Sequence, residues 1–123
     1  MKKIKRKPLI KKLDEVVSKI VRRRGSCIKC GSRINMLNCS HWYGRVVQSV
    51  RWDFDNVKCA CVGCHFWFDG HPHEHTEFVK ELLGDLNFDA LRLKANTGRK
   101  LETYELQELL TKLKEKLETC GVT

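Results

Sequence analysis

The chain has 123 residues, 24 of them Lys or Arg against 15 Asp or Glu, which gives a formal net charge of +9. This length predicts one compact domain with a helical extension. Without a signal peptide or a membrane-length apolar run, we expect a cytoplasmic protein with no membrane partner. The chain has seven cysteines, and in a reducing cytosol the paired ones are expected to bind metal rather than to form disulfides.

The excess positive charge lies entirely in residues 1–24, which carry eleven Lys and Arg against two acidic residues, a net of +9. From Pro8 onward apolar residues recur at helical spacing, and Gly25 is suited to end the helix. We interpret residues 1–25 as a basic arm and helix that bind DNA, while a solvated, solubilising face fits the charge run equally well. The side chains predicted to contact DNA here are Lys11, Lys12, Lys19, Arg22, Arg23 and Arg24.

Residues 26–96 are predicted to form a zinc-stapled central domain, because so small a unit rarely stabilises itself through its core alone. Two strands of a hairpin are predicted over Cys39–Trp42 and Val46–Trp52, with Gly44 near the turn. A helix is then predicted to begin near residues 61–64.

Further helices are predicted after a loop over residues 70–73. Thr76 is placed to cap a helix that Gly84 ends. Asn87 is placed to cap a short helix that runs through Leu93.

The segment over residues 97–123 is predicted to hold one long helix, about Thr103 to Thr119. Its leucines are spaced 4, 3 and 4 residues apart, which forms an a/d seam about two heptads long. These are Leu106, Leu110, Leu113 and Leu117. Such a seam is short for a free coiled coil, so the helix is expected either to pack on the N-terminal helix or to pair two subunits in a homodimer.

Two Cys-x-x-Cys pairs predict a structural zinc site. The pairs are Cys27/Cys30 and Cys61/Cys64. Thiolates three residues apart on a tight knuckle reach one tetrahedral ion, and two knuckles complete its four ligands. Cys59 is a rival for the second knuckle, but its spacing is less suitable. Because four cysteines leave no position for water, the zinc is expected to be structural rather than catalytic.

A His-Asn-His series lies within this cysteine frame. Phosphodiester hydrolysis needs a base for the attacking water and a cation on the scissile phosphate. His41, at the end of a predicted strand, is the candidate base, and Asn56 is expected to bond a backbone carbonyl across the connecting loop. His65 can offer a neutral imidazole to a metal, and Asp69 lies four residues on, on the same helix face. Each histidine alone is more often a structural group, whereas the ordered combination rarely arises by chance.

Four segments of the chain resemble the HNH endonucleases, and within them the phage NinG (Rap) recombination nucleases and the recombination endonuclease VII group. They are CIKCG at 27–31, CSHWYGR at 39–45, RWDFDNV at 51–57 and CVGCH at 61–65. The resemblance, over roughly residues 27–95, implies a ββα-metal core with His41 as general base, Asn56 as structural asparagine and His65 as a ligand of Mg²⁺ or Mn²⁺. It also implies a phage-encoded enzyme, in a bacterial cell, that acts on Holliday junctions or D-loops, often as a dimer.

One position departs from the family pattern. Many HNH enzymes place an Asp or His just before the catalytic histidine as a metal ligand, whereas this chain has Ser40. The remaining coordination is therefore open to Asp53, Asp69 and water. Arg45 and Arg51 are each either a phosphate contact or a structural cation.

The histidines at 71, 73 and 75 do not share a helix face, which favours a polar loop with a helix start over a second metal site. We predict an α+β protein whose small ββα-metal core is flanked by an N-terminal basic helix and C-terminal helices. Its predicted function is that of a metal-dependent DNA endonuclease, structure-selective for branched DNA. The alternatives are a non-catalytic zinc-ribbon module that binds nucleic acid and a zinc-stapled adaptor that binds a protein through its leucine seam.

Overall fold

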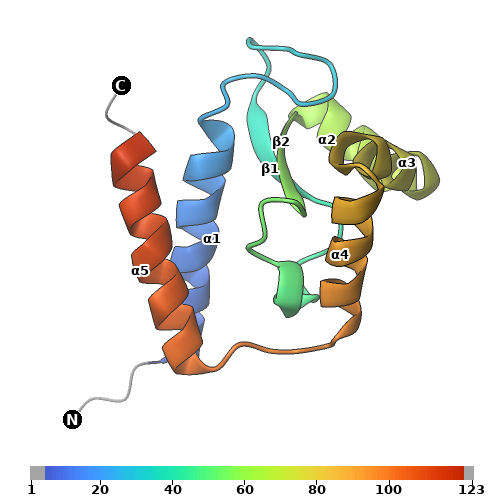
Figure 1. Cartoon of the computed structure of the whole chain (residues 1–123). Helices are drawn as coiled ribbons and strands as arrows, with labels where there is room; N and C mark the ends of the chain where they lie inside the picture. Colours follow the sequence, from blue (N-terminus) through green and yellow to red (C-terminus); the bar gives the residue numbers. More distant parts are fainter. Residues whose placement is uncertain (1–4, 121–123) are drawn as a thin grey trace.

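The structure is a computed structural model that describes residues 5–120, so the first four residues of the predicted basic arm lie outside the described part. Within it the chain forms a small α+β structure with five α-helices, one 3₁₀ helix and one two-stranded antiparallel sheet (Figure 1). In chain order these are α1 Arg6–Arg22, β1 Leu37–His41, η1 Gln48–Val50, β2 Val57–Cys61, α2 Val62–Gly70, α3 Pro72–Leu83, α4 Asp85–Asn96 and α5 Thr103–Cys120. None of the helices in this range combines the length and the apolar content that a membrane crossing requires.

Helices α1 and α5 lie side by side and form one wall of the molecule (Figure 1). Leu13 of α1 and Leu106 of α5 are both 0% exposed, and they share a hydrophobic cluster with Leu110 and Leu113. Burying a leucine fully contributes roughly 1.5–3 kcal/mol. The leucine seam of α5 is thus covered by α1 within one chain, which is the first of the two packings expected for it.

The strands β1 and β2 pair antiparallel, with Leu37 opposite Cys61 and His41 opposite Val57. The prediction of a strand over residues 46–52 is therefore wrong. That stretch forms a loop with the 3₁₀ helix η1, and the second strand comes after it in the chain.

Packing explains why residues 46–52 do not form a strand. Val50 belongs to a cluster with Leu91 and Ala95 of α4, whereas Trp52 belongs to the cluster around α1. In a strand, residues 50 and 52 would lie on the same face. Because their side chains enter different parts of the core, the backbone between them turns.

The sheet carries different helices on its two faces. Val57 belongs to the cluster of α1 and α5, whereas Ala60 packs with Phe68 of α2. Side chains alternate along a strand. His41, opposite Val57, therefore lies on the α1 side of the sheet, and Ser40 lies on the α2 side.

Helices α3 and α4 begin earlier than predicted. Helix α3 starts at Pro72, whose fixed φ suits the first turn, so Thr76 lies inside the helix and not at its cap. Gly84 ends α3 as predicted, and its φ of 81° lets the chain turn there. Helix α4 follows at once from Asp85, before the predicted cap Asn87.

Candidate metal centre and candidate active site

Four cysteine side chains from two separate segments meet in one cluster. Cys27 and Cys30 lie in the loop after α1, and Cys61 and Cys64 lie at the end of β2 and the start of α2. Their four Sγ atoms are all within 4.8 Å of one another, and Cys30 Sγ is 3.7 Å from Cys61 Sγ. Tetrahedral zinc with Zn–S bonds of ~2.3 Å places its sulfur ligands about 3.8 Å apart. The donor set and its spacing therefore fit the predicted structural zinc ion.

Backbone N–H groups stabilise the thiolate form of two cysteines in the cluster. The N–H of Lys29 points to Cys27 Sγ at 3.4 Å, and that of Cys64 points to Cys61 Sγ at 3.5 Å. Burial raises the pKa of Cys27, but its backbone hydrogen bonds outweigh burial and lower the pKa to about 6. The N–H of Cys64 likewise lowers the pKa of Cys61. Burial raises the pKa of Cys64 to about 12, so its thiolate requires the charge of the metal.

Cys59, the rival ligand for the second knuckle, is not part of this cluster. It lies opposite Cys39 in the sheet and packs on the α1 side. Burial raises the pKa of both thiols, that of Cys39 to about 11. Both are therefore neutral core side chains, and the four cysteines that do cluster are those predicted from their spacing.

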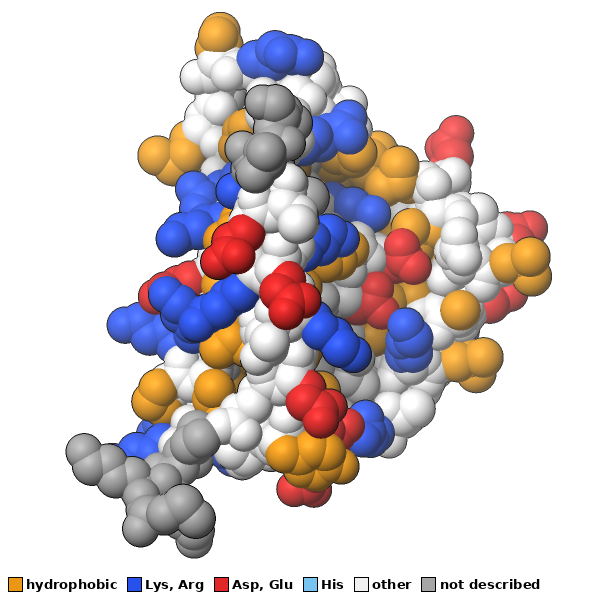
Figure 2. Space-filling model, turned by 60° about the vertical axis from the view of Figure 1, so that its left-hand side comes forward, with side chains coloured by type: hydrophobic (Ala, Val, Ile, Leu, Met, Phe, Trp, Pro, Cys, Tyr) orange, Lys and Arg blue, Asp and Glu red, His pale blue; other side chains and the backbone are white. Residues whose placement is uncertain are grey.

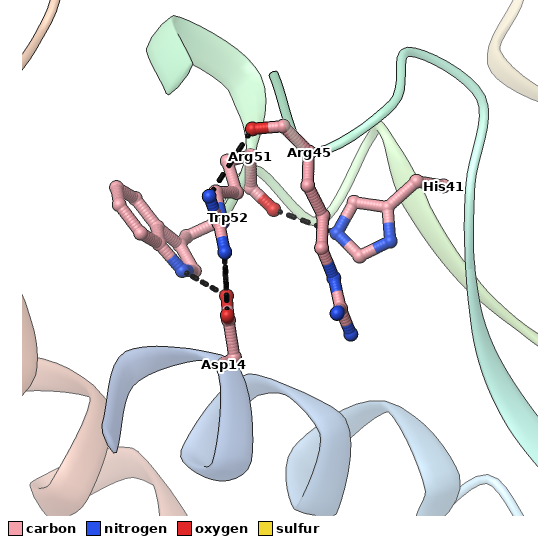
Figure 3. Close-up of polar contacts among 5 residues, drawn as sticks. All are labelled: Asp14, His41, Arg45, Arg51 and Trp52. Atoms are coloured by element: carbon pink, nitrogen blue, oxygen red, sulfur yellow. Dashed lines mark hydrogen bonds and ion pairs between the residues drawn. The ribbon is translucent and has the colours of Figure 1, made fainter. Parts of the chain in front are cut away.

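His41 lies at the end of β1, where the following loop holds its ring (Figure 3). Its Nε2 is 3.0 Å from the backbone oxygen of Arg51. Since a carbonyl only accepts hydrogen bonds, Nε2 carries the proton and Nδ1 keeps its lone pair. Burial lowers the pKa of His41 more than the Arg51 hydrogen bond raises it, so the ring is neutral at about pH 7. A fixed neutral imidazole of this kind is able to take a proton from water.

Asn56 holds the loop that connects the two strands through side-chain hydrogen bonds. Its side chain is 1% exposed. Its Nδ2 donates to the backbone oxygens of Tyr43 and Val50 at 3.0 and 3.1 Å, and its Oδ1 accepts from the N–H of Tyr43 at 2.8 Å. Asn56 thus makes the carbonyl bonds across the loop that were expected of it.

The carbonyl that holds His41 belongs to an arginine that α1 fixes in place (Figure 3). Arg51 Nη2 and Nε donate to the Asp14 carboxylate at 2.7 and 3.1 Å, and Trp52 Nε1 donates to it at 2.9 Å. Arg51 Nη1 also donates to the backbone oxygen of Arg45 at 3.3 Å. Burial raises the pKa of Asp14, but the hydrogen bonds from Arg51 and Trp52 lower it below its ordinary value. Two roles were predicted for Arg51, phosphate contact and structural cation. These contacts support the structural role.

Cationic side chains gather near His41, between α1 and the loop after β1. Lys19, Arg22 and Arg45 line a hollow of about 370 Å³, which the acidic residues Asp14 and Glu15 also border. The side chain of Arg45 extends past the His41 ring (Figure 3). The fold thus brings three of the predicted DNA-contacting residues together beside the candidate base.

The other predicted DNA-contacting cations are exposed along α1 and just after it. They are Lys11, Lys12, Arg23 and Arg24. Lys12 forms an exposed ion pair with Glu15 at 3.8 Å, and Arg23 donates to the backbone oxygen of Leu117. On the face around α5, Lys and Arg are interspersed with Asp and Glu (Figure 2). Among the described residues, that face therefore carries no continuous cationic surface.

The candidate ligands for a catalytic cation lie on α2. His65 Nε2 is 3.8 Å from Asp69 Oδ2, one helical turn later, and His65 Nδ1 is buried without a hydrogen-bond partner. Imidazole and carboxylate together suit a divalent cation. Within the described part of the chain, only the four cysteines bring three or more potential ligands to metal-binding distance. A cation at His65 and Asp69 would take its remaining ligands from water and phosphate.

The other two residues considered for this cation have different surroundings. Asp53 Oδ2 accepts from Lys94 Nζ at 3.0 Å, and Asp53 Oδ1 accepts from the N–H of Asp55 at 2.9 Å. Asp53 therefore anchors its loop to α4. Ser40 is 4% exposed, on the α2 side of the sheet.

The three histidines around Pro72 have three separate surroundings. His71 Nδ1 is 2.7 Å from a backbone oxygen of α2, and His73 pairs with an exposed glutamate. His75 is buried, with its ring stacked 4.2 Å from that of Phe68. Burial lowers the pKa of His75, and Asp69 opposes this shift.

Sequence reasoning missed two residues of the site, Asp14 and His75. Asp14 is an acidic residue within a run of cations, and that position was the only signal it offered. Nothing in the spacing of the histidines distinguished His75, whose proximity to Asp69 comes from the packing of α3 on α2.

No protein-family model, curated protein or solved structure matches this chain. Its function is therefore inferred from the site itself. The described residues include four cysteines that fit zinc, an oriented imidazole on the α1 side of the sheet, and a separate His–Asp pair on α2 suited to a divalent cation. Base, phosphate contacts and cation are the components that phosphodiester hydrolysis needs.

Proposed function

We propose that this protein is a metal-dependent DNA endonuclease of the HNH type, which hydrolyses phosphodiester bonds. The observation that carries the proposal is the hydrogen bond from His41 to the Arg51 carbonyl, which leaves Nδ1 of a neutral imidazole as the base. A module that only binds nucleic acid does not need a histidine held in this way beside a cationic hollow. The order β1–β2–α2, an antiparallel pair followed by a helix, supports the ββα core.

Each residue has a separate role in the proposed reaction. His41 Nδ1 takes the proton of the attacking water, and Arg45 stabilises negative charge on the phosphate. Asn56 holds the loop that supplies the orienting carbonyl. His65 and Asp69 would hold Mg²⁺ or Mn²⁺, which supplies Lewis-acid stabilisation of the phosphate and the leaving oxygen.

The zinc ion would act on the fold and not on the substrate. Four thiolates leave it no open coordination position. It would tie the loop around Cys27 and Cys30 to the end of β2 and the start of α2, and so set the position of His65, the residue after Cys64.

Branched DNA is the proposed substrate. Cations along α1 and around the hollow supply phosphate contacts, which position a protein on DNA without reading its sequence. This agrees with the resemblance to phage recombination nucleases, which favours Holliday junctions or D-loops. If two subunits act together, a junction is expected to receive paired, symmetrical nicks.

The test is a panel of labelled substrates: a junction, a flap, a duplex and a single strand, each with Mg²⁺, with Mn²⁺ or with a chelator of both. His41→Ala is expected to lower the cleavage rate about 10²–10⁴-fold. His73→Ala, which removes an exposed histidine, is the matched control and should cut at the wild-type rate. Wild-type cleavage by His41→Ala would show that His41 is not the base. Absence of cation-dependent cleavage of every substrate would refute the nuclease.

A second candidate function is a non-catalytic zinc-stapled module that binds nucleic acid. It is favoured by the ligand clustering, because in the described residues only the four cysteines come together in a group of three or more. This candidate predicts tight, salt-sensitive DNA binding without cation-dependent cutting. The same substrate panel, with binding measured in parallel, separates the two.

A further inference from the structure

One acidic side chain of α1 makes several hydrogen bonds to the loop before β2. The Asp14 carboxylate accepts two hydrogen bonds from Arg51 and one from Trp52, across sequence separations of 37 and 38 residues. The side chains of Asp14 and Arg51 are 20% and 18% exposed. The contact is therefore largely shielded from water, and it fixes two consecutive residues at once.

These contacts continue to the candidate base. The Arg51 side chain is held at one end by Asp14 and also donates to the Arg45 oxygen. The backbone oxygen of the same Arg51 is the acceptor for His41 Nε2 at 3.0 Å. One residue, Arg51, thus joins Asp14 through its side chain to His41 through its backbone oxygen (Figure 3).

DNA binding alone does not explain an acid at this position. Asp14 borders the hollow lined by Lys19, Arg22 and Arg45, where its negative charge repels phosphate. A DNA-binding surface would therefore be more favourable without it. The hydrogen bonds that Asp14 accepts from Arg51 and Trp52 explain why an acid is present here.

We propose that Asp14 is a positioning residue: by holding Arg51 and Trp52 it fixes the carbonyl that orients His41, and so couples the docking of the basic helix α1 to the geometry of the base. The catalytic consequence rests on the proposed nuclease function. The effect on the His41 ring does not, because it follows from the contacts alone.

The experiment compares Asp14→Asn with Glu15→Gln in the full zinc-loaded chain. Both variants remove one negative charge from adjacent residues of α1, but only Asp14 contacts Arg51. Asp14→Asn is expected to lower kcat on the junction substrate at least about 10-fold, since small displacements of a catalytic group cost up to about 10²-fold. Its KM should stay the same or fall, because a charge that repels phosphate is gone. Glu15→Gln should keep the wild-type kcat.

Nitrogen NMR of the His41 ring supplies a readout that does not depend on cleavage. The wild type and Glu15→Gln are expected to show one tautomer, with the proton on Nε2, and Asp14→Asn a mixture of tautomers. Asp14 raises the pKa of His41, while Arg45 and Arg51 lower it, so the pKa of His41 should also fall in Asp14→Asn. Equal kcat and an unchanged tautomer in both variants would overturn the proposal.

The two proposals fail in different ways. If the wild type cuts no DNA but the tautomer changes only in Asp14→Asn, the positioning role stands and the nuclease is refuted. Thermal melts check folding. Should Asp14→Asn not fold, Asp14→Asn combined with Arg51→Gln replaces the ion pair by a neutral amide pair. That double variant is expected to show the lowered kcat and the mixed tautomers, and wild-type values for both would overturn the positioning role.

Discussion

Replacement of Asn56 by alanine tests whether the loop between the strands is held as the structure indicates. Asn56 is 1% exposed, and its amide makes two hydrogen bonds to the Tyr43 backbone and one to the Val50 oxygen. Alanine would leave one N–H and two carbonyl oxygens without these partners. Because the site is buried, water cannot easily replace the lost hydrogen bonds.

The magnitude follows from the number of bonds. Each intramolecular hydrogen bond contributes about 1 kcal/mol net, so the three together predict a loss of about 3 kcal/mol in the free energy of unfolding. For a chain of this size, that loss lowers Tm by roughly 10 °C. Asn87→Ala is the control, because Asn87 is exposed and makes one hydrogen bond, to the Leu83 oxygen at 3.3 Å. Its effect should stay within about 0.5 kcal/mol.

The assay is urea unfolding with zinc kept in excess, so that loss of the metal does not enter the comparison. A free energy of unfolding for Asn56→Ala equal to that of the Asn87→Ala control would refute the reasoning. Asn56→Asp sharpens the test, because it keeps an acceptor for the Tyr43 N–H but places an oxygen against two carbonyls. Burial raises the pKa of such a carboxyl above its unfolded value. Over the pH range in which zinc stays bound, its destabilisation should therefore grow as the pH rises.

Three further predictions concern the metal, the base and the cations. Cys30→Ser is expected to lose the bound zinc in metal analysis, because a structural site needs all four ligands. Below the pKa of His41, the cleavage rate at fixed cation concentration should fall about tenfold per pH unit. Burial holds that pKa below its ordinary 6.5. A rate that falls only below about pH 4 would point to a carboxylate base. Replacing Lys19, Arg22 and Arg45 by glutamine should reduce the salt slope of DNA binding by up to about 3, and replacing exposed lysines of α5 should leave it unchanged.

Local patterns in the sequence predicted which cysteines cluster and where the terminal helices lie. The two residues between paired cysteines set a knuckle that closes on a single ion, so Cys27, Cys30, Cys61 and Cys64 were identified without any tertiary information. The leucine spacing likewise predicted the helix that the structure shows as α5, Thr103–Cys120. Both signals are properties of short stretches of backbone.

The second strand was misplaced because its signal is not local. In β2 only Lys58 is less than buried, and Cys59, Ala60 and Cys61 are buried in succession. A strand covered on both faces shows no alternation of apolar and polar residues. Its position depends on β1 and on helices from both ends of the chain, which the sequence does not place relative to one another.

The sequence by itself determined that this protein carries two Cys-x-x-Cys pairs that fit zinc, a basic N-terminal helix and a His-Asn-His series in a fixed order. Only the tertiary structure decided which nitrogen of His41 is held, since that depends on where the Arg51 carbonyl lies. It also showed that the Arg51 side chain pairs with Asp14, 37 residues away, and so is not free to contact phosphate. Spacing along the chain identifies the residue types a site contains, whereas the atoms that meet are set by how α1 packs against the sheet.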